Sequence, residues 1–370
     1  MPVAMYAFPL LLFLLLLLPQ GGQAAPLRLG IAGLSHSHVH GLLQRGDRGD
    51  IEIVGIAEPD RALAQRLADR YGFSMDEVYP SLEALIAARQ PEAVAAFGSI
   101  YEHLAVVEAC APRGIHVMVE KPLAVSMDHA TRMAQLARRH GIQLLTNYET
   151  TWYPTTGKAY ALARQDTVVG PIRKVVVRDG HRGPENIGID PEFLAWLTDP
   201  VLNGGGAVTD FGCYGANLLT WLMDGARPLR VTATTRRLQT DLHPLVDDEA
   251  TIILDYADAV GLVEASWNWP IGRKDMEIYG LRGAILADNR HDLRIRIAAG
   301  YDGFAEEALH LEAREVPFDD PFACFAAVVR GALHLSPYEP SSLENNLIVV
   351  EILDAARLSA RRGRSVSLKE

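Results

Sequence analysis

The sequence predicts an α/β protein in which a doubly wound parallel sheet is followed by an α+β domain with an open, mostly antiparallel sheet. Three observations lead to this fold class. Short apolar strands alternate with helices from residue 27 to residue 148, several strands follow one another closely between residues 229 and 287, and the chain has 370 residues, 49% of them hydrophobic. Single hydrophobic cores rarely grow past roughly 250 residues, so this length predicts about two domains.

The first domain is expected to span residues 26–148. Its strands are short runs rich in Val, Ile, Leu or Ala, at residues 27–32, 51–57, 93–97, 115–119 and 143–145. Between them, helices are expected at residues 61–71, 102–111 and 127–140, and Gly72 and Gly114 end the first two. Repeated strand-helix-strand units with short links predict a parallel sheet covered by helices on both faces.

The second domain is expected to span residues 149–338 and a C-terminal helix and tail residues 339–370. A helix at 157–165 and a strand at 172–177 precede a glycine-rich segment and a helix at 214–223. Strands follow at 229–234, 250–254, 260–267, 276–279 and 284–287. Short turns between these strands favour antiparallel pairing. The last helix is predicted to begin with a capping box formed by Ser341 and Glu344.

The first 25 residues have the features of a secretory signal peptide. They contain no charged side chain, and an unbroken apolar run from Leu10 to Leu18 is followed by Pro19 and small residues. This run is too short for a membrane-spanning helix, which needs about 20 residues. We expect cleavage near Ala24 or Ala25, no stable membrane insertion afterwards, and a periplasmic or secreted protein. If the true start codon lies downstream, the protein is cytoplasmic.

The composition excludes several classes of partner and site. The 46 acidic residues outnumber the 35 Lys and Arg residues and give a net charge of −11. Nucleic acids and anionic membranes are bound through excess positive charge, so neither is expected as a partner. Cys110, Cys213 and Cys324 are widely spaced and form no C-x-x-C pair, which predicts buried thiols rather than disulfides or a cysteine metal site.

The turn after the first strand resembles the G-x-G-x-x-G fingerprint of a Rossmann dinucleotide-binding domain. Gly33 supplies the first position, Ser35 replaces the second glycine, and His38 replaces the third. Glu58 ends the second strand, where a carboxylate accepts hydrogen bonds from the adenosine ribose. A carboxylate there repels a 2′-phosphate, so NAD is favoured over NADP, although the nearby Arg61 leaves NADP open.

Three histidines in this turn, His36, His38 and His40, raise the question of a metal. His36 and His40 would share one face if the stretch were helical. No Cys, Asp or Glu ligand accompanies them within the motif. We therefore expect no metal, and expect the imidazoles of His36 and His38 to line the cofactor site as hydrogen-bond donors.

A second motif, Glu120-Lys121-Pro122, lies at the carboxyl end of the fourth strand. Ligands of open α/β sheets bind at this edge, so Glu120 and Pro122 are expected beside the cofactor. A lysine at this point can hydrogen-bond a carbinol or carbonyl oxygen, and a nicotinamide cation nearby would lower the pKa of the Lys121 ammonium toward the working range.

A third motif follows the glycines at 204–206. Asp210 and Tyr214 are four residues apart and would share one face of a helix that begins by Asp210, with Asn217 one turn further along. The glycines permit either close backbone approach or flexibility. Asp210 could also cap the helix.

These residues resemble the glucose-fructose oxidoreductase and inositol dehydrogenase (Gfo/Idh/MocA) family over nearly the whole chain after residue 25. The matching segments are the first turn, Glu120 to Pro122, Gly204 to Asn217, Asp247 to Thr251 and Ala355 to Val366. The resemblance implies a Rossmann domain and an open-sheet domain that forms the substrate pocket and often oligomer contacts, and we therefore expect a homo-oligomer. It also implies that Lys121 is the active-site lysine and Asp210 the substrate-side aspartate.

Tyr214 stands where many members of that family have histidine. In this respect the chain is similar to a tyrosine subgroup that acts on aldoses and dihydrodiols, in which the phenol donates or accepts the proton. Because a free tyrosine has a pKa near 10, the phenol needs the positive field of Lys121 or nicotinamide to act as a base.

Further polar and aromatic side chains are candidates for a sugar-binding wall, because aromatic faces pack on C–H groups while amides, imidazoles and guanidinium groups bind hydroxyls. They are Asn147, Tyr148, Trp152, His181, Arg182, Trp196 and Asn217.

The sequence thus predicts an exported NAD(P)-dependent oxidoreductase acting on a sugar, glycoside or polyol. Lys121 and Tyr214 would handle the hydroxyl proton, and Asp210 would orient the substrate. Free NAD is scarce outside the cytoplasm, which favours a tightly bound, recycled nucleotide. Two alternatives remain: an NAD-dependent glycoside hydrolase that works by transient oxidation and elimination, and a non-catalytic carbohydrate-binding protein.

Overall fold

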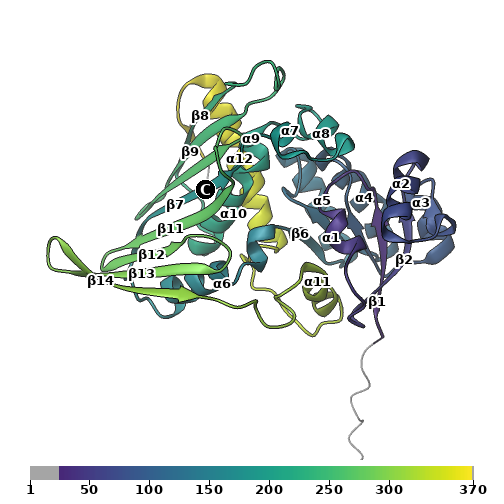
Figure 1. The fold of residues 1–370 in the computed structure, drawn as a ribbon, viewed down its shortest axis with the longest axis horizontal. Coiled ribbons are helices and arrows are strands. Elements are labelled where there is room, and N and C mark those ends of the chain that lie inside the picture. The colour runs from purple at the N-terminus through teal and green to yellow at the C-terminus, as the bar shows by residue number, and fades with distance from the viewer. Residues whose placement is uncertain (1–24, 369–370) are drawn as a thin grey trace, which may run out of the picture.

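The computed structural model describes residues 25–368, which form two domains side by side (Figure 1). The signal peptide predicted for residues 1–25 lies outside this range except for Ala25. A parallel sheet in the first domain and a mixed, mostly antiparallel sheet in the second confirm the predicted fold class. Within residues 25–368, no helix is long and apolar enough to cross a lipid bilayer.

The first domain is built on a six-stranded parallel sheet with the order β3-β2-β1-β4-β5-β6. Its strands are β1 (Leu27–Ala32), β2 (Ile51–Ala57), β3 (Val78–Tyr79), β4 (Ala93–Ala96), β5 (His116–Glu120) and β6 (Leu144–Asn147). Its helices are α1 (Val39–Leu43), α2 (Arg61–Tyr71), α3 (Leu82–Arg89), α4 (His103–Cys110) and α5 (Met127–His140). The direction of strand addition reverses between β1 and β4, and such a reversal marks the ligand crevice of an open α/β sheet.

Local sequence signals explain where these elements begin and end. Leu27, Leu29 and Ile31 of β1 are fully buried, as expected for a central parallel strand. The Asp60 carboxylate caps α2 by accepting from the backbone N–H groups of Ala62 and Leu63. Short 3-10 helices lie at Met75–Glu77, Ile100–Glu102, Ala111–Arg113 and Glu149–Trp152.

The second domain contains a nine-stranded sheet with the order β14-β13-β12-β11-β7-β10-β9-β8-β15. Its strands are β7 (Ile172–Gly180), β8 (Arg230–Arg236), β9 (Glu249–Asp255), β10 (Val260–Ser266), β11 (Arg273–Gly280), β12 (Gly283–Ala287), β13 (Asp292–Ala299), β14 (Gly303–His310) and β15 (Val366–Ser367). Strands β7 and β10 pair in parallel and the other neighbours are antiparallel.

Seven α-helices and one π-helical turn follow β6 in the described residues. They are α6 (Pro154–Tyr160) with a π-helical turn at Ala161–Gln165, α7 (Pro184–Ile187), α8 (Pro191–Leu197), α9 (Ala207–Asp210), α10 (Gly212–Leu222), α11 (Pro321–Val329) and α12 (Leu343–Arg362). The helix predicted for 157–165 therefore begins earlier and widens after Tyr160.

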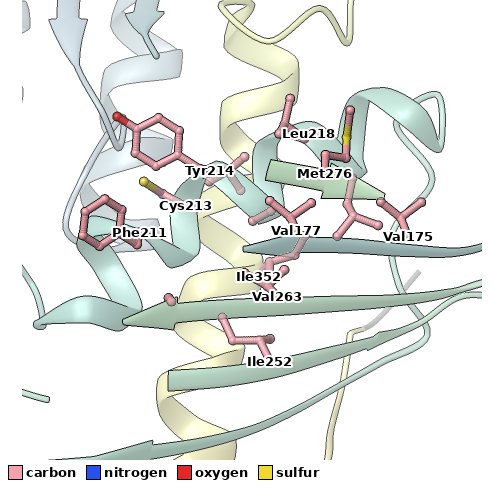
Figure 2. Close-up of a cluster of buried hydrophobic side chains, with 14 of the residues drawn as sticks. Val175, Val177, Phe211, Cys213, Tyr214, Leu218, Ile252, Val263, Met276 and Ile352 are labelled. Atoms are coloured by element: carbon pink, nitrogen blue, oxygen red, sulfur yellow. The ribbon is translucent and has the colours of Figure 1, made fainter. Parts of the chain in front are cut away.

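Helices α10 and α12 cover one face of the large sheet (Figure 1). Figure 2 shows the resulting core, in which Val177, Val263 and Ile252 from the sheet lie near Ile352 of α12. The ring of Tyr214 borders this cluster, and its hydroxyl group points away from the apolar side chains (Figure 2). The core thus fixes the ring and leaves the phenol oxygen for polar partners.

Helix α12 also reaches the first domain, where it contacts α5 and β6. The Arg357 guanidinium donates to the backbone oxygen of Val125 at 2.9 Å and to the Thr209 hydroxyl at 3.2 Å. The helix begins one residue later than predicted: Ser342 is the N-cap, and its hydroxyl accepts from Asn345 N–H, while the Ser341 carbonyl accepts from the Thr146 N–H of β6. The last helix therefore links both domains.

The segment around α11 belongs in space to the first domain, although the predicted boundary assigns it to the second. Phe322 and Phe325 pack with Leu27 and Leu29 in one buried cluster. Asp320, which caps α11, accepts from the Arg45 side chain at 3.1 Å. The chain thus returns to the Rossmann sheet before entering α12.

The three cysteines are buried and free, which confirms the expectation of buried thiols. Burial raises the pKa of each thiol to about 12.

Candidate active site

A cavity of about 990 Å³ lies between the two domains. The first domain contributes Lys121 and residues 36–38 of the turn that follows β1, which we call the β1 turn. The second domain contributes Asp210, Tyr214 and residues of β11. The cavity therefore opens at the carboxyl ends of β1 and β5, the edge where an open α/β sheet binds its ligands.

Lys121 and Asp210, predicted from separate motifs, form a buried ion pair. The Lys121 ammonium also donates to the Asp210 backbone oxygen at 3.0 Å. The second carboxylate oxygen of Asp210 accepts from Trp267 Nε1 at 2.9 Å. Burial alone would lower the pKa of Lys121, but the Asp210 charge outweighs it and the pKa is raised. Asp210 therefore stabilises the ammonium, and the lowering expected from a nicotinamide cation stays a prediction.

Tyr214 lies beside this pair and is 1% exposed. The Lys121 nitrogen is 5.3 Å from the centre of the Tyr214 ring, and the Tyr148 ring packs edge-on against it at 5.5 Å. Burial, followed by the charge of Glu149, raises the pKa of the Tyr214 phenol well above its usual value. The phenol therefore keeps its proton at neutral pH.

Lys274 is the cation nearest the phenol oxygen, and the sequence analysis did not find it. Its ammonium donates to the Tyr214 hydroxyl at 3.5 Å and forms an ion pair with Glu149. Glu149 in turn accepts from the Tyr153 hydroxyl at 2.5 Å. Lys274 belongs to β11, which begins at Arg273 rather than at the predicted Met276. Extending the strand by two residues would have placed Lys274 in the sheet.

Asp179 is a second group that was missed. It is 1% exposed, and neither carboxyl oxygen has a hydrogen-bond partner among residues 25–368. It lies directly opposite Lys274 in the β7–β11 register. Burial raises the pKa of Asp179 well above its usual value, which favours the protonated, neutral carboxyl group. Only a protonated carboxyl can remain in such a site without a partner.

The β1 turn has the geometry that the dinucleotide fingerprint requires. Gly33 has φ of +81°, and a Cβ atom at this position would lie 2.8 Å from the backbone nitrogen of Gly98. Ser35 is half-buried in the same turn. The Glu58 carboxylate accepts from the backbone N–H groups of Leu34 and Asp60, both at 2.8 Å. Glu58 therefore holds the turn in place from the end of β2.

His36 is buried against α8, where its ring lies 4.5 Å from that of Phe193 and 5.5 Å from that of Trp196. Helix α1 begins only at Val39, so His36 and His40 do not share a helical face. His40 instead pairs with Asp190 at 2.7 Å. The helix that would have placed His36 and His40 on one face, and so allowed a shared metal, is therefore absent at His36.

Potential ligand atoms of His36, His38 and Glu120 lie within 4.8 Å of one another. His36 Nδ1 accepts from the His38 backbone N–H at 3.1 Å. Burial lowers the pKa of His36 well below its usual value, so the ring is neutral and its proton is on Nε2. Nε2 is then a donor that makes no hydrogen bond among the described residues, and it lies 3.9 Å from a Glu120 carboxylate oxygen. This arrangement favours a hydrogen bond to a ligand over metal coordination.

Glu120 links this turn to the end of β6. It accepts from Asn147 Nδ2 at 2.8 Å and contacts His38 Nδ1 at 2.8 Å. Asn147 Oδ1 accepts from Trp152 Nε1, also at 2.8 Å. Asn147 and Trp152 do not line the cavity. They were expected in the substrate wall, and the structure instead places them behind Glu120. Pro122 is buried next to this network.

The other expected wall residues divide into two groups. His181 lines the cavity and packs edge-on against Phe211 at 4.9 Å. Arg182 is exposed and does not line it. Asn217 is fully buried on the far side of α10, where its amide donates to Pro340 O and Asn345 Oδ1. Its place one turn beyond Tyr214 directs it toward α12 instead of the cavity.

The glycine-rich segment before α9 is held by close backbone contact. A Cβ atom at Gly206 would lie 1.8 Å from the backbone oxygen of Asp247. The Asp247 carboxylate accepts from Gly206 N–H at 3.0 Å and from Val208 N–H at 2.7 Å. Asp247 therefore orients the short helix that presents Asp210.

Family comparisons match both domains. The model of the oxidoreductase family with an NAD-binding Rossmann fold matches residues 27–148, and that of the GFO/IDH/MocA C-terminal domain matches residues 162–286. The chain is 30% identical over 246 residues to D-xylose 1-dehydrogenase (NADP(+)) 2 of Haloferax volcanii, which covers 65% of this chain and 70% of that protein. It is 28% identical to trans-1,2-dihydrobenzene-1,2-diol dehydrogenase of Sus scrofa, over 63% of this chain and 66% of that protein.

Solved structures share the fold. Aldose-aldose oxidoreductase from Caulobacter crescentus, complexed with glycerol, superposes with a TM-score of 0.74 at 20% identity and covers 93% of this chain and 100% of its own. An inositol dehydrogenase homolog from Azotobacter vinelandii, complexed with NAD+, gives a TM-score of 0.79 at 20% identity and covers 93% and 98%.

Proposed function

The chain belongs to the Gfo/Idh/MocA family of oxidoreductases, and from this membership we propose that it transfers hydride between a nicotinamide dinucleotide and a hydroxyl-bearing carbon of a sugar or polyol. The observation that carries the proposal is the meeting of Lys121 from the first domain and Tyr214 from the second in one cavity, with 5.3 Å between the ammonium nitrogen and the ring centre.

The β1 turn fits a dinucleotide. Gly33 provides the tight turn, and the Nε2–H of His36 is a buried donor with no partner among the described residues, suited to a phosphate or carboxamide oxygen. Gly33, Ser35, His36, His38 and Glu58 would hold the cofactor, with Glu120 and Pro122 behind it. When bound, the dinucleotide supplies the carbon that takes or gives the hydride. We propose NAD rather than NADP, because the Glu58 carboxylate would repel a 2′-phosphate.

The proton chemistry is assigned to Lys121 and Tyr214. Lys121 remains an ammonium because Asp210 raises its pKa, so it donates a hydrogen bond to the substrate oxygen. The Tyr214 phenol keeps its proton in the cavity described here and is set to donate it to a carbonyl oxygen. In the oxidative direction the phenolate takes the hydroxyl proton. Asp210 fixes the position of Lys121 and can accept from a neighbouring substrate hydroxyl.

Lys274 and Asp179 are proposed as positioning residues for this proton. The Lys274 ammonium, 3.5 Å from the phenol oxygen, stabilises the phenolate when it forms. Asp179 stays neutral across the strand pair, so it adds no second negative charge next to Glu149. Because only Glu149 of these two acids is ionised, Lys274 has one anionic partner and can also donate a hydrogen bond to the phenol.

We further propose that the protein is exported and retains its nucleotide between turnovers. The support is the uncharged, apolar leader of residues 1–25, since a compartment poor in free NAD favours an enzyme that does not release it.

The proposed activity is tested with a panel of aldoses, polyols and their oxidised partners, each offered with NAD or NADP in both directions. Formation or loss of reduced nicotinamide is followed by absorbance. We expect turnover with at least one sugar or polyol, and its loss in the Tyr214→Phe variant. No turnover with any pair, together with no measurable binding of either nucleotide, would contradict the proposal.

A further inference from the structure

We infer that the substrate carries an oxyanion, a carboxylate or a phosphate ester, that pairs with Arg290, which lines the same cavity beside Tyr153. This inference deepens the proposed function and rests on it for the identity of the reacting centre. The observations behind it are the pairing of the charged side chains in the cavity and the position of Arg290 relative to Tyr214.

Each acidic residue that lines the cavity already has a basic partner. Lys121 pairs with Asp210, and Lys274 pairs with Glu149. Arg273 contacts Asp275 at 2.6 Å, and Arg294 contacts Asp288 at 2.6 Å. The remaining acid, Glu277, accepts from Arg178 at 2.8 Å. Every carboxylate that lines the cavity is therefore paired with a Lys or Arg side chain, and Arg178 is shared by Glu277, Asp275 and Glu264.

Arg290 is the lining cation left over from this pairing. Among residues 25–368, no carboxylate lies within ion-pair distance of its guanidinium, which instead lies 5.1 Å from the centre of the Tyr153 ring. A guanidinium offers five N–H donors in a planar fork that fits carboxylate and phosphate oxygens. The cavity lining therefore has one Lys or Arg side chain without an acidic partner, and its guanidinium has the geometry that binds an oxyanion.

The turn between β12 and β13 holds Arg290 in this position. The Thr155 hydroxyl of α6 donates to the backbone oxygens of Asn289, at 2.7 Å, and of Arg290, at 3.2 Å. The side chain is exposed to solvent, but its backbone is tied to a buried threonine and its guanidinium rests on an aromatic face. Its direction is thus set without an acidic partner.

A continuous line of contacts connects Arg290 with the reacting end. The Tyr153 ring under Arg290 carries the hydroxyl that donates to Glu149, Glu149 pairs with Lys274, and Lys274 reaches the Tyr214 hydroxyl. All five residues line the same cavity. A substrate whose hydroxyl lies at Tyr214 can therefore extend along this wall and place an acidic group at Arg290.

The test compares binding within matched neutral and acidic pairs: D-glucose with D-glucuronate, D-galactose with D-galacturonate, D-sorbitol with D-gluconate, and D-glucose with D-glucose 6-phosphate. Calorimetry gives Kd for the full chain with no nucleotide added, so that no substrate turns over. We expect at least one acidic member to bind about 10-fold or more tightly than its neutral partner, the size of a hydrogen bond to a charged group. The carboxylate and phosphate arms show which oxyanion is bound.

Variants decide whether Arg290 is responsible. Arg290→Gln is expected to bring the ratio of the two Kd values close to one, and Arg290→Glu to reverse the preference. The control Arg139→Gln removes one charge from the exposed end of α5, outside the cavity, and should keep the wild-type ratio. Equal affinities within every pair, or a preference that survives Arg290→Gln, would overturn the inference. Because binding is measured without turnover, a protein that fails the redox assay but shows the Arg290-dependent ratio contradicts the proposed function and not this subsite.

Discussion

Tyr214 has a cation beside its hydroxyl in addition to Lys121 and nicotinamide, the two that were expected to activate the phenol. The Lys121 ammonium lies over the ring and is paired with Asp210, whereas the cation close to the hydroxyl is Lys274. Burial and nearby carboxylates raise the pKa of the phenol. The rates of the two reaction directions should therefore depend on pH in different ways.

Alcohol oxidation needs the phenolate, which is scarce below a raised pKa, so we expect its rate to rise about tenfold per pH unit through neutral pH. Carbonyl reduction needs the protonated phenol, and its rate should stay flat until the pH reaches the raised pKa. Rates of both directions measured from about pH 6 to about pH 10, which spans the usual phenol pKa, check this sign. A falling oxidation rate with rising pH would contradict it.

Lys274→Met removes the positive charge beside the phenol and leaves Glu149 unpaired, and both changes raise the pKa of Tyr214 further. We expect slower oxidation at any fixed pH and a rate profile displaced to higher pH. Lys174→Met is the matched control, because Lys174 lies on the same sheet but is exposed and outside the cavity. An unchanged profile in Lys274→Met would remove Lys274 from the proposal.

Site residues that stand in a local motif could be predicted from the sequence, whereas residues that meet only through strand pairing could not. Lys121, Asp210 and Tyr214 stand in local motifs, and the structure brings all three into one cavity. Lys274 and Asp179 meet through the register of β7 and β11, which no local pattern specifies. Asn217 was predicted in the substrate wall and lies elsewhere, because helical spacing does not reveal that this turn of α10 faces α12.

At the scale of elements, the glycine-rich segment and α9 depend on Asp247. Its carboxylate accepts from two backbone N–H groups that would otherwise be buried without partners. We expect Asp247→Ala to lower the free energy of unfolding by about 1–3 kcal/mol. Urea denaturation measures this, with Asp241→Ala, an exposed acid of the same loop, as the control. Equal stability of the two variants would show that the cap contributes little.

Elements with a strong internal pattern were predictable. Helices α2 and α5 have the predicted bounds, because apolar spacing and a glycine at the end mark both. Strand β3 has two residues, and β14 is exposed along nearly its whole length, so neither has a hydrophobic pattern to read. Helix α11 was not predicted from its apolar run. Its packing on the first domain depends on contacts between residues that are far apart in the sequence.

At the scale of the whole molecule, the leader and the nucleotide make a joint prediction. Expressed with its own leader in a secretion-competent host, the protein should appear outside the cytoplasm with a new N-terminus near Pro26, and denaturation should release NAD. N-terminal sequencing and mass spectrometry of the released small molecules check both. A retained Met1 with no bound nucleotide would contradict export and retention together.

Net hydrolysis makes a different whole-molecule prediction. Incubation with aryl glycosides and no added NAD would release the aryl group if transient oxidation and elimination took place. The redox proposal expects no release across the panel.

The central claim is that Lys121 and Tyr214 act on one hydroxyl, and the most direct measurement is the single-turnover rate of hydride transfer in Lys121→Met, Tyr214→Phe and the double variant, with nucleotide binding measured alongside. Each single change should slow the step by about 100-fold or more. The effects of residues that act as a unit do not multiply, so the double variant should be slowed far less than the product of the two single-variant rate reductions. A near wild-type rate in either single variant, with the nucleotide still bound, would contradict the claim.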